Sequence, residues 1–362
     1  MIKLATLFSG VGAIEEAFIK QKIEHKIVFA ADNGERELLT PAEEIFKVIR
    51  SMDLIQKNNY IEELYREESK KENFMQKQYL ANFSVPTGHY YQDVRFLDGK
   101  VYQQEHIDLL VGGSPCQSFS VIGKRGGLED TRGTLFYEYA RIVKECQPKA
   151  FIYENVLGML NHDKGKTWAT INNVFQSLNY DIKLFILNAK NYGIPQDRRR
   201  IFVVGSKEKN EMEVPKEINL TTSISDYVEE TVPAKYYLGR KGFEFVTNPF
   251  YFNRAKVNGT IMMCQKANQQ FNWNGDFRFE VLDYTKHTPD ILERAYIGEY
   301  KGEMGVIRQL TPRECFRLMG FDDDYKIVVH DTMAWRQAGN AIVVNVLEAI
   351  IKEMSDKGTL KC

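Results

Sequence analysis

The chain has 362 residues with 43% hydrophobic and 27% charged residues, as in an ordinary folded protein, and its net charge is −1. The charge excludes a global basic field, although a local basic cleft would suffice to bind nucleic acid. No apolar run approaches the roughly 20 residues of a membrane span, and the N-terminus does not read as a signal peptide. Five scattered cysteines form no CxxC pair, which fits a reducing compartment. We expect a cytoplasmic enzyme with no metal site.

Short apolar runs alternate with helical patterns through the first 205 residues. This alternation predicts an α/β fold with a doubly wound, mostly parallel sheet. The segment from about 35 to 83 differs, because it is rich in Glu and Lys and has a helical period. We interpret it as a helical insertion with a solvated face. The expected strands are residues 4–8, 27–31, 107–111, 150–153, 184–187 and 201–204.

The alternation stops after Gly205 and the chain is irregular up to about residue 307. A helical pattern returns near Arg308, with Thr311 as the expected N-cap and Pro312 in the first turn. A strongly apolar last helix is expected from Ala341. We therefore expect a catalytic and cofactor-binding domain formed by residues 1–205 and 308–362, and a smaller irregular domain formed by residues 206–307.

The run Phe8-Ser-Gly-Val-Gly-Ala13 lies between the first strand and the first helix. Its glycines allow a tight turn and the close approach of a ligand to the backbone. The third glycine of a dinucleotide fingerprint is replaced by Glu15, which favours a nucleoside without phosphates. Asp32 ends the second strand, where a carboxylate can accept from ribose hydroxyls. Asp93 suits an adenine amino group if it ends a third strand.

Polar residues follow several other strands. Cys116 comes after the strand at 107–111 and a Gly-Gly-Ser-Pro turn, which places a thiol at the edge where open α/β sheets bind ligands. Glu154 follows an apolar run. Arg198 and Arg200 share one face of an extended segment, and either can orient a carboxylate or a phosphate. Singly, each residue also has an ordinary structural interpretation.

In this order, the motifs resemble those of the C5-cytosine-specific DNA methyltransferase family, of the bacterial or phage restriction-modification type. The resemblance covers residues 1–33, 90–205 and 308–351, and leaves out the helical insertion and the middle segment. The blocks that carry it are Phe8-Ser-Gly-Val-Gly12, Gly113-Ser-Pro-Cys-Gln-Ser-Phe-Ser120, Glu154-Asn-Val156, Gln196-Asp-Arg-Arg-Arg200, Arg308-Gln-Leu-Thr-Pro-Arg-Glu-Cys315 and Gly339-Asn340.

The resemblance implies that the thiolate of Cys116 adds to C6 of a cytosine flipped out of double-stranded DNA, and that a methyl group passes from S-adenosyl-L-methionine to C5. S-adenosyl-L-homocysteine is then the second product. By the same resemblance, Glu154 protonates or hydrogen-bonds N3 and the amino group. Arg200 contacts O2, and Arg198 steadies the carboxylate.

The resemblance also implies a cofactor pocket and a lid. The segment after Cys116 contains four glycines and resembles a loop that closes over DNA, with Ser120, Lys124, Arg125 and Arg132 as expected DNA contacts. The family often has Glu and then an aromatic at the end of the second strand. This chain has Asp32 and Asn33, so stacking of residue 33 on adenine is not expected. The expected cofactor-binding residues are Phe8, Gly10, Gly12, Asp32, Asp93, Pro115, Leu135 and Asn340.

The middle segment is expected to read the DNA sequence. Residues 236–279 hold eleven aromatics, six Asn, and six Lys or Arg against two acidic residues, which gives a local net charge of +4. The candidate contacts are Arg254, Gln265, Gln269, Gln270 and Arg278, because Arg and Gln pair with base edges and Arg with phosphate. Most of the aromatics are expected to fill a small core.

Two alternatives stay open. One is a C5-cytosine RNA methyltransferase on the same scaffold, although that branch typically has a second proline where this chain has Ser114. The other is a DNA-binding protein with an inactive site, although no residue of the expected machinery is missing. We expect a monomeric enzyme that protects host DNA, with a restriction endonuclease as a separately acting partner.

Overall fold

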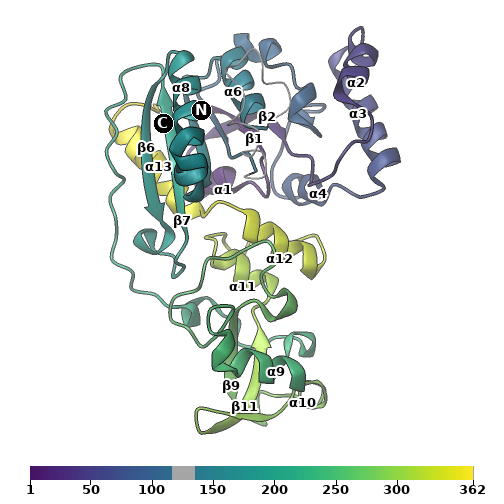
Figure 1. Cartoon of the computed structure of the whole chain (residues 1–362), viewed down its shortest axis with the longest axis vertical. Helices are drawn as coiled ribbons and strands as arrows, with labels where there is room; N and C mark the ends of the chain where they lie inside the picture. Colours follow the sequence, from purple (N-terminus) through teal and green to yellow (C-terminus); the bar gives the residue numbers. More distant parts are fainter. Residues whose placement is uncertain (116–134, 362) are drawn as a thin grey trace. The chain divides into compact units, whose positions relative to one another are not determined.

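The computed structural model describes residues 1–115 and 135–361, which divide into two compact units (Figure 1). The first unit comprises Met1–Leu187, Arg199–Lys216 and Val346–Cys362, and the second comprises Asn188–Arg198 and Glu217–Asn345. Residues 308–345, which the sequence analysis assigns to the catalytic domain, fall in the second unit by this division of contacts. The division into a catalytic and a DNA-reading domain stays a prediction.

A seven-stranded sheet with the order β3-β2-β1-β4-β5-β7-β6 forms the centre of the first unit. Strands β1, β2, β3, β4 and β5 pair in parallel, whereas β7 pairs antiparallel with β5. The expected doubly wound, mostly parallel sheet is confirmed. The strands are β1 (Ile2–Leu7), β2 (His25–Ala31), β3 (Tyr90–Tyr91), β4 (Leu109–Gly112), β5 (Ala150–Val156), β6 (Asp181–Asn188) and β7 (Arg199–Ser206).

Helices α6 and α8 cover one face of this sheet. Phe136 and Tyr139 of α6 and Phe175 of α8 are fully buried and pack against Phe151 and Tyr153 of β5. Each such side chain contributes roughly 1.5–3 kcal/mol of burial free energy, which fixes β5 and the residues at its end. The helices of this unit are α1 (Ala13–Lys20), α2 (Ala42–Ile49), α3 (Leu54–Ser69), α4 (Phe74–Leu80), α6 (Leu135–Cys146), α7 (Gly158–Asn161), α8 (Lys166–Ser177) and most of α13 (Val344–Asp356).

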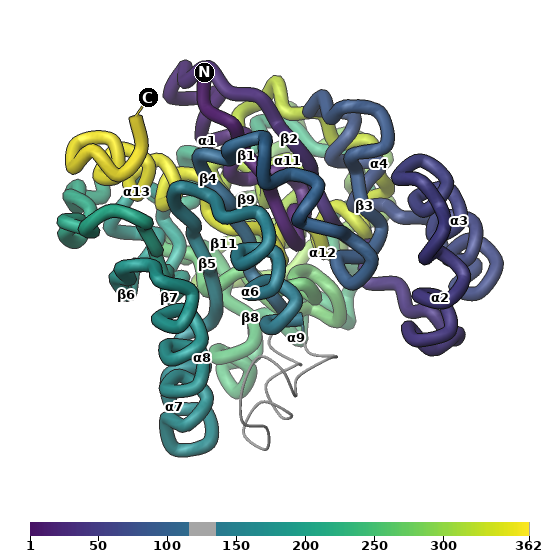
Figure 2. Tube along the Cα trace, turned by 90° about the horizontal axis from the view of Figure 1, so that it is seen from above, coloured from purple at the N-terminus to yellow at the C-terminus, as the bar shows by residue number. Residues whose placement is uncertain are grey.

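The segment interpreted as a helical insertion contains α2, α3 and α4. Helices α2 and α3 lie beyond the β3 edge of the sheet (Figure 2). They have a small core of their own, in which Ile45, Ile49, Ile61 and Tyr65 are buried beside Phe96.

The second unit contains a four-stranded sheet with the order β10-β11-β9-β8. Its core includes Phe243, Phe277 and Ile307. Thr311 is the N-cap of α11, as predicted, and it forms a capping box, because Thr311 Oγ1 accepts from the Glu314 N–H and the Glu314 carboxylate accepts from the Thr311 N–H. The elements are α9 (Arg240–Thr247), β8 (Ala255–Val257), β9 (Gly275–Val281), α10 (Pro289–Arg294), β10 (Gly298–Tyr300), β11 (Glu303–Gln309), α11 (Pro312–Arg317) and α12 (Asp331–Asn340), with short 3₁₀ turns that include Pro249–Tyr251 and Phe271–Trp273.

Candidate active site

The turn after β1 has the strained backbone that its glycines predict. Phe8, Gly10 and Gly12 have φ angles of 52°, 55° and 81°, in the left-handed region. A Cβ atom at Gly12 would lie 2.1 Å from the ring of Phe83, so a side chain does not fit there. The turn is tied to the second strand because the Gly10 N–H donates to Asp32 Oδ2 at 2.9 Å.

Asp32 keeps acceptor capacity for a ligand. Its Oδ1 accepts from the Gly34 N–H at 2.8 Å and its Oδ2 from Gly10, whereas a carboxylate offers about four lone-pair sites. Burial raises the pKa of Asp32, and these two backbone N–H groups partly offset the rise. A partly exposed carboxylate beside a glycine turn fits the ribose hydroxyls of a nucleoside such as S-adenosylmethionine.

Asp93 is more occupied than the sequence suggests. It is 5% exposed, and it accepts from the backbone N–H of Arg95, from Nε and Nη2 of Arg95, and from the hydroxyl of Tyr65. These four donors match the four lone-pair sites of the carboxylate. An adenine amino group at Asp93 would have to replace one of them.

The other expected cofactor residues are spread over both units. Phe8 packs on the main core, Pro115 is exposed after β4, and Leu135 is the first residue of α6. Asn340 is the exposed last residue of α12, in the second unit. Only the first three therefore lie in the same unit as the glycine turn.

Glu154 lies directly against the strand that leads to Cys116. A Cβ atom at Gly113 would be 2.7 Å from the carbonyl oxygen of Glu154 and 2.9 Å from its Oε2, so only glycine allows this approach. Arg200 Nε forms a salt bridge with Glu154 Oε1 at 3.1 Å. The side chains are 18% and 15% exposed, so the pair is largely shielded from water but still accessible. The antiparallel pairing of β5 with β7 places them together, since Val156 is opposite Arg200.

Sequence reasoning did not single out the neighbours that hold the chain before Cys116. Asn155 Nδ2 donates to the carbonyl of Ser114 and to the hydroxyl of Tyr153, each at 3.0 Å, and the Ser114 and Tyr153 hydroxyls are 2.7 Å apart. Asn155 is 2% exposed and Ser114 is 3% exposed. A polar residue inside the apolar β5 run was the available signal for Asn155.

Arg198 lies in the second unit and contacts backbone there. Its guanidinium donates to the carbonyls of Gln265, Gly339 and Ala341, the last at 2.8 Å. It is 4% exposed. Gln196 acts similarly, since its side chain donates to the Leu318 carbonyl and accepts from the Gln265 N–H. These contacts show Arg198 and Gln196 joining three segments that are distant in sequence.

Cys116 and the expected lid residues Ser120, Lys124, Arg125 and Arg132 lie outside the described residues. Two of the described cysteines are unsuited to nucleophilic attack. Burial raises the pKa of Cys146 to about 12, and it raises the pKa of Cys315 well above its usual value. Both groups therefore remain thiols at neutral pH.

The candidate DNA contacts differ in exposure, and Gln269 and Gln270 are each only 1% exposed. Arg254 is exposed. Arg278 is partly buried and donates to Ser225 Oγ at 3.1 Å, and burial followed by the charge of Arg308 lowers its pKa. Gln265 is fully buried, and its backbone is held by Gln196 and Arg198. Arg254 is thus the most exposed of these candidates.

Comparison with known proteins decides the family. The model of the C-5 cytosine-specific DNA methylase family matches residues 2–356. The chain belongs to this family. It is 38% identical over 303 residues to the type II methyltransferase M.HpaII of Haemophilus parainfluenzae, a match covering 78% of this chain and 80% of the relative. The expected class of enzyme, a DNA (cytosine-5) methyltransferase, is confirmed.

Other relatives extend the picture. The type II methyltransferase M.HhaI of Haemophilus parahaemolyticus is 33% identical over 67% of this chain and 74% of its own. The orphan methyltransferase M.SPRI of Bacillus phage SPR is 29% identical over 98% of this chain and 97% of its own. Among solved structures, the S. pombe Dnmt2 methyltransferase aligns over 99% of both chains with a TM-score of 0.66 and 17% identity, which shows a shared fold. Among the described residues, no helix is long and apolar enough to cross a membrane.

Proposed function

We propose that this enzyme methylates C5 of a cytosine within a specific sequence of double-stranded DNA, as the modification enzyme of a restriction-modification system. The observation that carries the proposal is the Arg200–Glu154 pair, whose carboxylate lies against Gly113, three residues before Cys116. Besides the thiolate of a cysteine, a carboxyl group and a guanidinium are what activation of a cytosine ring requires. The type II relatives support the restriction-modification context.

In the proposed mechanism, the thiolate of Cys116 attacks C6 of a flipped cytosine and forms a carbon–sulfur bond, which makes C5 nucleophilic. Glu154 hydrogen-bonds or protonates N3, so that the electrons of the broken C5–C6 double bond are stabilised in the ring. Arg200 donates to O2 and holds Glu154 in place. After C5 has gained its methyl group, it loses its proton, and the carbon–sulfur bond breaks to restore the ring and release the thiolate.

When bound, S-adenosyl-L-methionine would supply the methyl group, with S-adenosyl-L-homocysteine as the second product. The glycine turn at Gly10 and Gly12 and the carboxylate of Asp32 would hold it, with Phe8, Pro115, Leu135 and Asn340 as further contacts. Asp93 would take part only by exchanging a present donor for the adenine amino group.

The proposal assigns the proposed DNA-reading role to residues 206–307, and the catalytic role to residues 1–205 and 308–362. It includes a monomer in the cytoplasm, with a restriction endonuclease acting separately on the same sequence. Arg198, which joins the carbonyls of Gln265, Gly339 and Ala341, would act through the segments it holds.

The test is to incubate the protein with methyl-labelled S-adenosylmethionine and either duplex DNA or tRNA, and to locate the label. We expect 5-methylcytosine in DNA. Label on adenine, or on RNA alone, would overturn the proposal. Bisulfite sequencing of DNA from an expressing host would then identify the target sequence.

The matched variants are Cys116→Ala and Cys146→Ala. The first should abolish transfer while DNA binding persists, because the nucleophile is lost and the DNA-binding surface is not. The second should retain transfer, because the Cys146 thiol is 1% exposed and donates to the Gly99 carbonyl. Full activity in Cys116→Ala would remove Cys116 from the mechanism.

A further inference from the structure

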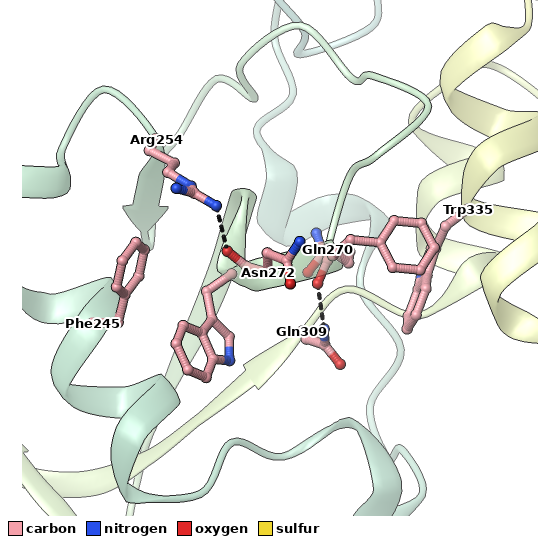
Figure 3. Close-up of a pocket in the computed structure, with 8 residues that line it drawn as sticks. Phe245, Arg254, Gln270, Asn272, Gln309 and Trp335 are labelled. Carbon is pink, nitrogen blue, oxygen red and sulfur yellow. Dashed lines mark hydrogen bonds between the residues drawn. The ribbon is translucent and has the colours of Figure 1, made fainter.

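The second unit contains a cavity whose lining does not include the Arg200–Glu154 pair, which belongs to the first unit. Its volume is about 440 Å³, within the roughly 300–1,000 Å³ of ligand pockets. It is lined by four aromatic side chains, three amide side chains and a single charged group, which is a cation. The lining residues are Phe245, Arg254, Gln270, Phe271, Asn272, Trp273, Gln309 and Trp335 (Figure 3).

The aromatic walls offer ring surface to a ligand. Phe245, Phe271 and Trp273 are only partly buried. Phe245 is stacked on Tyr251 with 4.1 Å between ring centroids, and Phe271 meets Trp335 edge to face at 5.9 Å. The indole of Trp335 is fixed because its Nε1 donates to the Leu310 carbonyl at 3.0 Å. Rigid rings of this kind form stacking platforms for planar ligands.

The polar groups at the cavity keep unused hydrogen-bonding capacity. Arg254 lies over the ring of Phe245 at 5.3 Å and donates Nη2 to the Asn272 carbonyl at 3.1 Å (Figure 3). Within the part of the chain that the structure describes, Arg254 Nε and Nη1 and the side-chain amide of Asn272 have no hydrogen-bond partner. Gln309 donates to the Gln270 carbonyl at 2.7 Å, which leaves its Oε1 to accept.

The turn that presents these groups is held in an unfavourable backbone conformation. Gln270, Asn272 and Trp273 have φ angles of 67°, 48° and 51°, which non-glycine residues rarely adopt and which cost about 1–3 kcal/mol each. The buried amide of Gln270 maintains the turn, because it donates to the Asp276 carbonyl and accepts from the Leu310 N–H. The free energy of unfolding is therefore reduced by this turn, which holds the cavity surface in a fixed conformation.

We infer that this cavity binds one unstacked base of the DNA, with the aromatic rings as its stacking platform and Asn272 and Arg254 at its polar edge. The inference rests on the proposed function and deepens it. Amide and guanidinium groups pair with base edges, and a lone cation without an acidic neighbour in the lining suits a polyanion. The nearby turn supports a nucleic-acid surface, because Phe250 and Phe252 are 81% and 68% exposed.

Tryptophan fluorescence tests the inference directly. The chain has three tryptophans, of which Trp273 and Trp335 line the cavity and Trp168 lies in α8. Oligothymidylate, whose bases are unstacked, should quench the fluorescence of the full chain without any cofactor. The quenching should persist in Trp168→Phe and fall at least twofold in Trp273→Phe.

Substitution of two arginines, Arg254 at the cavity and Arg240 outside it, distinguishes a contact to a base from a general effect of positive charge. Arg254→Ala and Asn272→Ala should each weaken oligothymidylate binding by about tenfold, the loss of one good polar contact to a base. Arg240→Ala is the control, since Arg240 is exposed, lies over the ring of Tyr296 at 5.5 Å and is outside this cavity. It should change binding by less than threefold. Circular dichroism checks that each variant is folded.

Unchanged binding in folded Asn272→Ala, or quenching carried wholly by Trp168, would overturn the inference. Cytosine methylation of DNA without quenching would overturn it too, while the proposed function stands. Quenching without methyl transfer to DNA would instead overturn the proposed function.

Discussion

Two of the arginine–carboxylate pairs among the described residues differ sharply in their surroundings. Arg200 and Glu154, at the end of β5, keep 18% and 15% of their side chains exposed and share one described contact at 3.1 Å. Arg308 and Glu314, in the second unit, are 1% and 0% exposed and form two parallel bonds at 2.9 Å. Arg308 also contacts Glu280, and Glu314 caps α11. We propose that the accessible pair serves the reaction, whereas the buried pair holds segments of the second unit together.

The two pairs differ in how far their side chains are buried. The buried pair satisfies nearly all of its hydrogen-bonding capacity, which burial of a charge requires. The accessible pair can be reached by a substrate, because its side chains are 18% and 15% exposed. Exposure, rather than the identity of the residues, distinguishes the two pairs.

The largest expected effect is on the accessible pair. Glu154→Gln removes the group that can protonate N3, so we expect kcat to fall by about 10²–10⁴-fold while stability changes little. Methyl transfer from labelled S-adenosylmethionine measures the rate. Glu208→Gln, an exposed change in the same unit, is the control. A rate within threefold of the original enzyme would remove Glu154 from the chemistry.

The buried pair should respond in stability. Glu314→Gln leaves the charge of Arg308 buried with less compensation, so the free energy of unfolding should fall by about 3–5 kcal/mol. Urea unfolding followed by the fluorescence of Trp273 and Trp335, in a Trp168→Phe background, reports on this unit. A change below about 1 kcal/mol would show that the pair contributes no more than a surface one.

The buried carboxyl of Glu15, whose pKa shift has no cation among its causes, can be compared with the buried carboxyl of Glu314, which pairs with Arg308. Glu15 is fully buried, and burial raises its pKa from 4.5 to about 7, offset in part by a hydrogen bond from Tyr79. A raised pKa means that the folded state binds the proton more tightly, so its stabilising effect is complete below pH 4.5 and is lost as the pH rises through about 7. Glu15→Gln should therefore gain stability relative to the original protein as the pH rises from 4.5 to about 7, by roughly 3 kcal/mol in all. Urea unfolding at several pH values checks this, and parallel pH profiles would contradict it.

The smallest effect is expected at an exposed pair. Arg317 Nε lies 2.7 Å from Asp323 Oδ1, but the side chains are 25% and 64% exposed. Arg317→Ala should cost about 0–1 kcal/mol, because water screens the attraction. The same unfolding assay as for Glu314→Gln measures it. A loss as large as that of the buried pair would break the link between burial and structural importance.

Local signals in the sequence were enough for the sheet and the family. Apolar runs predicted six strands that the structure contains, and Thr311 was correctly expected to cap a helix. The two-residue strand β3 has too few residues for a period, so only the position of Asp93 hinted at it. The antiparallel direction of β7 has no local signature, because strand direction depends on how the chain returns to the sheet.

The sequence by itself determined the chemistry available to this protein: a glycine turn, strand-end carboxylates, a cysteine after a strand, and arginines before the last strands. Only the tertiary structure decided which of these groups can still bind a ligand. The lone pairs of the Asp93 carboxylate are taken up by donors from Arg95 and Tyr65, and Gln265 is fully buried. Asn272 and Arg254 have open donors at a cavity. The physical reason is that burial and hydrogen-bond partners come from segments distant in sequence, which no local pattern specifies.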